Sequence, residues 1–247
     1  MTGTLRIDPA NNRLYVKSVL TEEKTTLEVL RTLPHTFRTL VIQAEKVDKK
    51  GCLHSLKKRL KRTQEPINIH ELFFLPACKS IEEIRVLDSY SDLDAILKHP
   101  IVINSTFSFT FIDFTAKVCD FLIVHKRVKY LSIGEVSAPG LATVIKSNPS
   151  LEYLVVKSTL LPVDILSFVE LLFATKHNPC VIDCQRCMNS REISRFLRRR
   201  RFKMETFFDS DDYTIIRVTH SKYIGYCVEI AFRSTLTIAS LQTAEVI

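Results

Sequence analysis

Apolar and polar positions alternate in a recurring six-residue pattern along the chain. The segments "VKYLSI" at 128–133 and "LEYLVV" at 151–156 both place apolar residues at the first, fourth and sixth positions. Alternation of this kind over a short run predicts a β-strand with one buried face. The pattern recurs, in places weakly, in "FRTLVI" at 37–42, "IEEIRV" at 81–86, "TFSFTF" at 106–111 and "PCVIDC" at 179–184.

The spacing of these segments predicts a repeat. The middle apolar residue falls at 84, 109, 131, 154 and 182, in steps of 25, 22, 23 and 28 residues. A period of roughly 20 to 29 residues with an L-x-x-L-x-L core is typical of leucine-rich repeats. A further copy at Leu40 lies 44 residues before Ile84, and "INIHELFF" between them also fits the strand template. A non-repetitive α/β domain is therefore the alternative.

A helix is predicted after each of these strands. After "LEYLVV", Pro162 occupies a favourable first helical position, and after "VKYLSI" Pro139 precedes apolar residues at helical spacing. One strand and one helix cannot cover their own apolar faces, whereas stacked copies can. We therefore expect an α/β fold: a short, irregular, leucine-rich-repeat-like solenoid with parallel strands on the concave face, helices outside and β caps at the ends.

The two ends of the chain have different patterns, so we divide it into three segments. In residues 1–36, "TLRID" and "RLYVK" predict a β-hairpin, and "TEEKTTLEVLRTL" predicts a helix capped by Thr21. Residues 37–203 hold the irregular strand–helix repeats. In residues 204–247, "YTIIRV" and "CVEIAF" predict a second hairpin, which would cover the open end of the solenoid before a C-terminal tail.

The polar positions of the predicted strands define a candidate partner-binding surface, because solenoids of this type bind proteins on an extended concave face. Tyr130 and Tyr153 occupy equivalent positions in neighbouring repeats. Tyrosine supplies a large contact area with few rotamers to immobilise, and packing beneath a loop is the alternative role for the pair. The predicted partner-binding residues are Tyr130, Tyr153, Lys129, Glu152, Glu82 and Arg85.

Glycine usage argues against a nucleotide-binding enzyme. The chain has only five glycines, at positions 3, 51, 134, 140 and 225, whereas loops that cradle phosphates need several glycines close together. The sequence also has no G-x-S-x-G elbow and no H-E-x-x-H pair. We therefore expect a protein with no catalytic residues, no enzymatic activity and no cofactor.

Cysteine usage indicates free thiols in the cytoplasm or nucleus, because the chain has seven cysteines and no N-terminal signal peptide. No apolar run is long enough to cross a membrane. His177, Cys180, Cys184 and Cys187 are residue types that bind zinc, but four ligands within 11 residues are crowded for a tetrahedral site. Cys184 instead fits an inward strand position, so we expect a structural role and no metal.

Basic residues gather in two stretches of this chain of net charge +8. One is an amphipathic segment around 52–62, and the other ends the helix expected at 190–201. In the second, Ile193, Phe196 and Leu197 have core-facing spacing, so we expect its arginines at the solvated end of a repeat helix. The predicted basic patch comprises Lys57, Lys58, Arg59, Lys61, Arg62, Arg198, Arg199, Arg200 and Arg201.

A family resemblance adds a functional expectation. Units of the "LEYLVV" kind, the basic helix end and the terminal "YTIIRV…CVEIAF" segment resemble the leucine-rich-repeat-like C-terminal domains of nematode F-box proteins, over roughly residues 37–233. The resemblance implies capture of a substrate for ubiquitination without catalysis by the chain itself. Members of that family carry an F-box helical segment that docks a ligase adaptor, and segment 21–33 is too short and too polar to be that segment.

The expected function is therefore a non-enzymatic protein-interaction module that acts as a substrate-recognition scaffold of a ubiquitin-ligase system. Its expected partner is a protein, and no membrane is involved. The alternative is a basic protein that binds nucleic acid or another acidic surface through the helices around 52–62 and 190–201.

Overall fold

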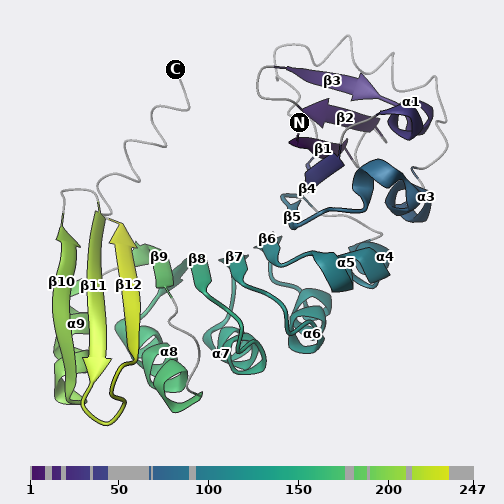
Figure 1. The fold of residues 1–247 in the computed structure, drawn as a ribbon. Coiled ribbons are helices and arrows are strands. Elements are labelled where there is room, and N and C mark those ends of the chain that lie inside the picture. Colours follow the sequence, from purple (N-terminus) through teal and green to yellow (C-terminus); the bar gives the residue numbers. More distant parts are fainter. Residues whose placement is uncertain are drawn as a thin grey trace. The chain divides into compact units, whose positions relative to one another are not determined.

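The computed structural model shows an α/β protein that divides into two compact units, residues 1–106 (unit 1) and 107–247 (unit 2). Figure 1 gives the elements and their labels. The structure describes residues 2–8, 13–17, 21–33, 36–43, 67, 69–88, 93–175, 181–187, 190–209 and 213–233.

The strands of unit 1 follow the order β5-β4-β1-β2-β3 in its sheet. Strand β4 pairs in parallel with β1 and β5, whereas β1, β2 and β3 form an antiparallel meander. The strands are β1 (Thr2–Asp8), β2 (Arg13–Lys17), β3 (Glu22–Thr25), β4 (Thr36–Ile42) and β5 (Glu83–Val86). The helices are α1 (Leu27–Thr32), α3 (Ile69–Phe74), the 3-10 helix η2 (Pro76–Cys78), α4 (Leu93–Leu97) and α5 (Pro100–Ser105).

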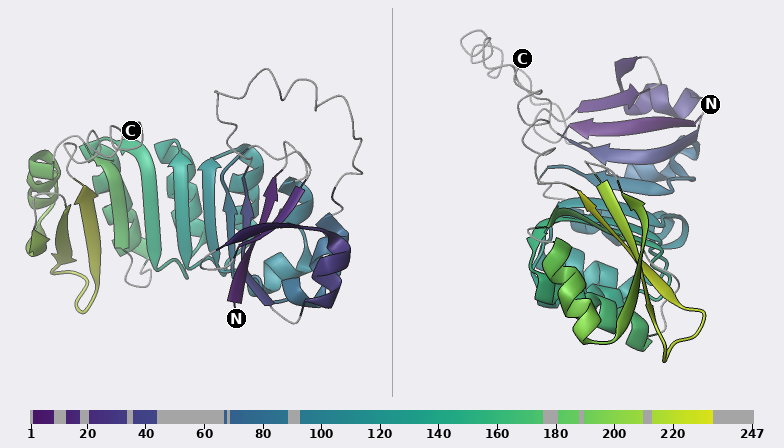
Figure 2. Two further views of the ribbon diagram at one scale, coloured as in Figure 1. Left: turned by 90° about the horizontal axis from the view of Figure 1, so that it is seen from above. Right: turned by 90° about the vertical axis from the view of Figure 1, so that its left-hand side faces the viewer.

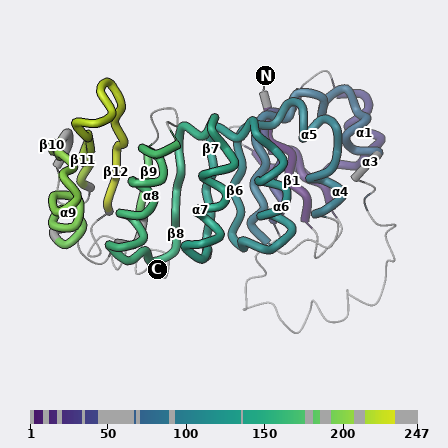
Figure 3. The backbone as a smooth tube through the Cα atoms, turned by 90° about the horizontal axis from the view of Figure 1, so that it is seen from below, coloured from purple at the N-terminus to yellow at the C-terminus, as the bar shows by residue number. Residues whose placement is uncertain are grey.

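Unit 2 alternates strands and helices and then ends in three strands. Its helices α6 (Ala116–Val124), α7 (Ala138–Ser147), α8 (Pro162–Thr175) and α9 (Ser190–Arg199) form a row on one face of the sheet, as Figures 2 and 3 show from opposite sides. The sheet order is β10-β11-β12-β9-β8-β7-β6. The strands are β6 (Ser108–Asp113), β7 (Tyr130–Glu135), β8 (Tyr153–Leu160), β9 (Val181–Cys187), β10 (Phe202–Asp209), β11 (Tyr213–His220) and β12 (Cys227–Arg233).

The apolar positions that recur in the sequence are the positions that pair with one another across the parallel strands of unit 2. Across β6, β7, β8 and β9, the four middle apolar residues pair in one continuous row, and all four are fully buried: Phe109, Leu131, Leu154 and Ile182. The residues two positions later pair in the same way. The predicted alternation of strand and helix is thereby confirmed for this part of the chain.

The same register holds in unit 1. Leu40 of β4 pairs with Ile84 of β5 and with Leu5 of β1, and all three side chains are fully buried. Helix packing closes this core on one face of the sheet through buried residues such as Leu30 and Leu72.

A buried asparagine joins neighbouring helices of unit 2. Asn148 follows the last turn of α7, and its Nδ2 donates hydrogen bonds to the carbonyl oxygens of Leu122 (2.7 Å) and Val144 (2.9 Å). Leu122 belongs to α6, so the amide connects α7 to the helix before it. The bond to Leu122 supplies a donor to a carbonyl in the last turn of α6, where the helix itself provides none.

The C-terminal strands form a more extensive structure than the predicted hairpin. β11 and β12 pair antiparallel as expected, but β10 forms a third strand that the sequence pattern did not indicate. The strand next to β9 is β12, which pairs with it in parallel and sets Ile230 beside Ile182. After β9, the chain therefore runs through α9 to β10 at the edge of the sheet. It then returns through β11 to β12, beside β9.

The helix predicted over "TEEKTTLEVLRTL" was wrong in its first half. Residues Glu22–Thr25 form the edge strand β3, which pairs with β2, and the helix begins only at Leu27. Thr26, not Thr21, caps it, with its hydroxyl oxygen accepting a hydrogen bond from the Val29 amide at 3.3 Å. The residues of β3 are mostly charged and do not alternate between apolar and polar, so the sequence pattern does not predict a strand there. Pairing with β2 determines their extended conformation.

The strand template in "INIHELFF" was also misleading, because its residues Ile69–Phe74 form α3. Leu72 and Phe73 are fully buried at adjacent positions, which a strand with one buried face does not allow. Phe73 stacks on the ring of His99 with centroids 4.5 Å apart. His99 in turn caps α5 by accepting a hydrogen bond from the Ile101 amide.

A glycine in β7 lies against the backbone of β6, and its replacement should be costly. A Cβ atom at Gly134 would lie 2.0 Å from the Ile112 carbonyl oxygen. Since the contacted group is backbone in a paired strand, we expect Gly134→Ala to lower the free energy of unfolding by about 3 kcal/mol or more, measured by urea denaturation. Ser132→Ala, two residues earlier in the same strand, should cost less than about 1 kcal/mol; equal losses would contradict this account.

Candidate functional site

The helix-free face of the sheet in unit 2 presents the residues that alternate with the buried row. In β7, Leu131 and Ile133 are fully buried beneath the helices, so Tyr130 and Ser132 point to the other face. In β8, Leu154 is buried in the same way and Tyr153 points to the helix-free face. This face is therefore the one surface of the parallel strands that the row of helices in Figure 1 does not cover.

Two tyrosines form an aromatic pair on this face. Tyr130 and Tyr153 are paired directly across β7 and β8, with ring centroids 5.3 Å apart and ring planes within 4° of parallel. Both side chains are partly exposed. A stacked pair of this kind contributes roughly 0.5–1.5 kcal/mol beyond its buried area, so each ring holds the other in position. The tyrosines that the sequence placed in neighbouring repeats are thus brought together.

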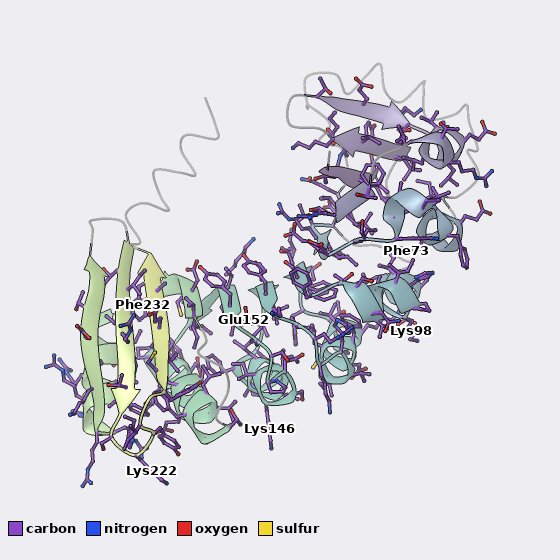
Figure 4. The ribbon with its side chains drawn as sticks, in the orientation of Figure 1. Phe73, Lys98, Lys146, Glu152, Lys222 and Phe232 are labelled. Carbon is purple, nitrogen blue, oxygen red and sulfur yellow. The ribbon has the colours of Figure 1, made fainter. Side chains whose placement is uncertain are left out.

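An ion pair lies at the beginning of the same two strands. Lys129 Nζ is 2.9 Å from Glu152 Oε1, and about half of each side chain is exposed. Figure 4 labels Glu152 on the strand side of unit 2. Water and salt weaken such a pair to less than about 1 kcal/mol, so it adds polar recognition groups next to the tyrosines more than it adds stability.

A buried carboxylate next to the tyrosine pair was missed by the sequence reasoning. Asp183 of β9 pairs in register with Val155 of β8 and is only 3% exposed. The hydroxyl of Tyr153 lies 3.5 Å from Asp183 Oδ2, at the long limit of a hydrogen bond. The available signal was the alternation in "VIDC", where an acidic residue stands between Ile182 and Cys184, which both face the helices.

The same row of the sheet continues into the C-terminal strands. Val181 of β9 pairs with Glu229 of β12, which pairs with Arg217 of β11. Arg217 donates hydrogen bonds to Glu229 Oε1 at 2.8 and 3.1 Å, and this hydrogen bond raises the pKa of Arg217 above its ordinary value. This pair was not predicted from the sequence, because the partners of residues in antiparallel strands cannot be assigned without the pairing register.

The two remaining predicted partner-binding residues lie in unit 1 and pair with neighbours there. Arg85 donates to both carboxylate oxygens of Glu83 at 2.9 and 3.0 Å. Glu82 lies 3.8 Å from Arg38. Four of the six predicted residues, Tyr130, Tyr153, Lys129 and Glu152, therefore form one cluster, and we restrict the candidate site to them and Asp183, under the name tyrosine face.

The predicted basic patch is described only in its second half. Lys57, Lys58, Arg59, Lys61 and Arg62 lie outside the described residues. Arg198, Arg199, Arg200 and Arg201 are all exposed at the end of α9, as expected for a solvated helix end. Ile193 and Leu197 of the same helix are fully buried, and Phe196 is partly buried.

The zinc site considered from the sequence falls only partly within the described residues, and of Cys187 only its place in β9 is described. His177 and Cys180 lie outside the described residues, and Cys184 is fully buried in β9 among the core residues. Within the described ranges, no group of three or more histidine, cysteine or acidic residues is placed to hold a metal ion.

A scan of the sequence against protein-family models gives no match, and a search against curated proteins gives no significant match. In the described part of the chain, no helix is long and apolar enough to cross a membrane.

A buried thiol in unit 1 makes stability depend on alkaline pH. Burial raises the pKa of Cys78 to about 12. The unfolded chain ionises this thiol near pH 9 while the folded chain keeps the proton, so the stability present below pH 9 is lost as the pH rises toward 12. Between pH 9 and 11, we expect the wild type to lose about 2 kcal/mol more of its free energy of unfolding than Cys78→Ala does.

Urea denaturation at intervals between pH 8 and 11 measures this difference. Comparison with the variant removes the contribution of tyrosines and lysines that also ionise in this range. Cys119→Ala provides a second comparison, because Cys119 is only partly buried. Parallel stability curves for the wild type and Cys78→Ala would show that the thiol is not protected by the fold.

Proposed function

We propose that this chain is a non-enzymatic protein-interaction module of the leucine-rich-repeat type, acting as a substrate-recognition scaffold of a ubiquitin-ligase system in the cytoplasm or nucleus. The observation that carries the proposal is the stacked Tyr130–Tyr153 pair on the helix-free face of a parallel sheet. Aromatic residues held in a fixed orientation and partly exposed are typical anchors of protein interfaces.

The arrangement of strands supports a solenoid of this type. Four parallel strands follow one another in chain order, each separated from the next by one helix, and their apolar markers pair in register. Each such unit covers the apolar face of its neighbour, as repeats in solenoids do. In such a solenoid the strands line the concave side, which binds the partner. Under this proposal the tyrosine face lies on that concave side.

The polar groups of the tyrosine face fit a protein partner. Lys129 and Glu152 flank the rings with charges of both signs, and Asp183 provides a carboxylate behind them. An aromatic centre with polar groups at its edge is the usual organisation of a protein interface. The partner segment that fits has a side chain able to lie against the tyrosine rings and hydrogen-bonding groups beside it.

Removing both rings should abolish partner capture without unfolding the protein. We expect Tyr130→Ala/Tyr153→Ala to reduce the recovery of specific partners from cell lysate at least about tenfold, because central aromatic anchors contribute about 2 kcal/mol or more each. Quantitative mass spectrometry of affinity-purified samples measures the recovery, and thermal denaturation checks the fold.

Two matched variants control this experiment. Tyr130→Phe/Tyr153→Phe keeps the stacked rings and should retain most of the capture. Val124→Ala removes an apolar side chain that is 79% exposed at the end of α6, away from the strand face, and should change nothing. Unchanged capture by the double alanine variant would exclude the tyrosine face as the partner site.

The same purification tests the ubiquitin assignment separately. A scaffold of a ligase should co-purify with a ligase adaptor, and that adaptor should be retained by the double alanine variant while captured substrates are lost. Partners that depend on the tyrosines in the absence of any ligase component would support an interaction module outside the ubiquitin system.

A further inference from the structure

Helix α9 presents arginines on the face opposite to its buried side. Ile193 and Leu197 are fully buried, and the helix packs against α8 and β10. Arg195, Arg198 and Arg199 are exposed and are related by three and four positions, so they share the outer face. Figure 3 shows α9 as the last helix of the row in unit 2, with α8 on one side.

The positive charge of this segment is not balanced by nearby acids. Residues 190–203 contain six arginines, one lysine and one glutamate. Arg200 lies 3.6 Å from Glu170 of α8. Among the described residues, Arg195, Arg198, Arg199 and Arg201 form no ion pair. A helix C-terminus carries the equivalent of only about half a negative charge, so four consecutive arginines exceed what its dipole requires.

The conformation of Arg201 also favours a functional role for this segment. Its φ angle is 63°, in the left-handed region, directly after the end of α9. Helices commonly end in this conformation with glycine, because a Cβ atom makes it unfavourable. The chain thus has a strained, exposed arginine where glycine would stabilise the turn into β10.

We propose that the outer face of α9 and the turn into β10, comprising Arg195, Arg198, Arg199, Arg201 and Lys203, bind the phosphate backbone of double-stranded nucleic acid without sequence selectivity. Guanidinium groups match phosphate oxygens in geometry and charge. This surface is separate from the tyrosine face, so the proposal goes beyond the proposed function and does not rest on it.

The composition of the surface favours a duplex over the other polyanions. None of the large, exposed apolar side chains of the described residues lies on α9. Single-strand binding uses aromatic side chains on which bases stack, and an acidic protein partner needs an apolar interface centre. Contacts to the backbone of a duplex require only the exposed cations.

Binding of a fluorescent 20-base-pair duplex, measured by anisotropy at 50 mM NaCl, tests the proposal on the full chain. We expect micromolar affinity for the wild type. Arg195→Gln/Arg198→Gln/Arg199→Gln should bind at least tenfold more weakly, and the slope of log K against log salt should become shallower by about 2 to 3. The control Lys117→Gln/Lys126→Gln/Lys146→Gln removes three exposed lysines of unit 2 and should bind within threefold of the wild type.

A single substitution separates binding from stability. Arg201→Gly should raise the melting temperature by roughly 2 °C, because glycine relieves the unfavourable φ angle. The same substitution should weaken duplex binding about threefold, since one phosphate contact is lost. If Arg201 had a purely structural role, a substitution that stabilises the fold would not weaken duplex binding.

Three results would overturn the proposal. The first is absence of duplex binding by the wild type at 50 mM NaCl. The second is equal binding by the arginine and lysine triple variants. The third comes from competition, in which polyglutamate and unlabelled duplex each displace the labelled duplex. If polyglutamate does so at the lower concentration of negative charge, the occupant is an acidic protein surface. Tyr130→Ala/Tyr153→Ala should bind the duplex as the wild type does, so failure of the proposed function leaves this test unaffected.

Discussion

The pairing of one apolar residue from each strand into a continuous buried row is the constraint on which unit 2 depends. Phe109, Leu131, Leu154 and Ile182 are each fully buried and lie side by side in the sheet. Because side chains in a strand alternate between two faces, this row also determines what the other face displays. A slip of one residue would bury Tyr130 and expose Leu131, so the core and the tyrosine face depend on the same register.

Close backbone contacts and buried polar groups then hold the neighbouring strands and helices of unit 2 at their spacing. Gly134 allows β7 to lie against the Ile112 carbonyl, and Asn148 donates hydrogen bonds to carbonyls of two neighbouring helices. Neither contact contributes much apolar burial. Both make the spacing between neighbouring elements specific. A larger residue at position 134 creates a clash, and a missing donor at position 148 leaves the Leu122 carbonyl without its hydrogen bond.

The two proposed surfaces differ in how their charges are arranged. On the sheet face, Lys129 is paired with Glu152 and Arg217 with Glu229, so recognition there depends on shape, aromatic contact and local hydrogen bonds. On α9, arginines exceed acids, and attraction acts over a longer range and weakens with salt. One chain can therefore offer a short-range protein-binding surface and a long-range electrostatic one without conflict between them.

The sequence by itself determined the four parallel strands of unit 2, most of its helices and the direction of the side chains in those strands. Period-two patterns such as "LEYLVV" specify one buried and one outward face, and equal spacing places Tyr130 and Tyr153 at equivalent positions. Only tertiary structure decided the rest. Segment 22–25 became a strand because β2 pairs with it, and β12 rather than β10 joined β9. Cross-strand register placed the Arg217–Glu229 pair in the row of the two tyrosines and Asp183 in the row next to it. Local patterns set which way a side chain points, whereas the identity of its neighbours depends on long-range pairing that no short window of sequence contains.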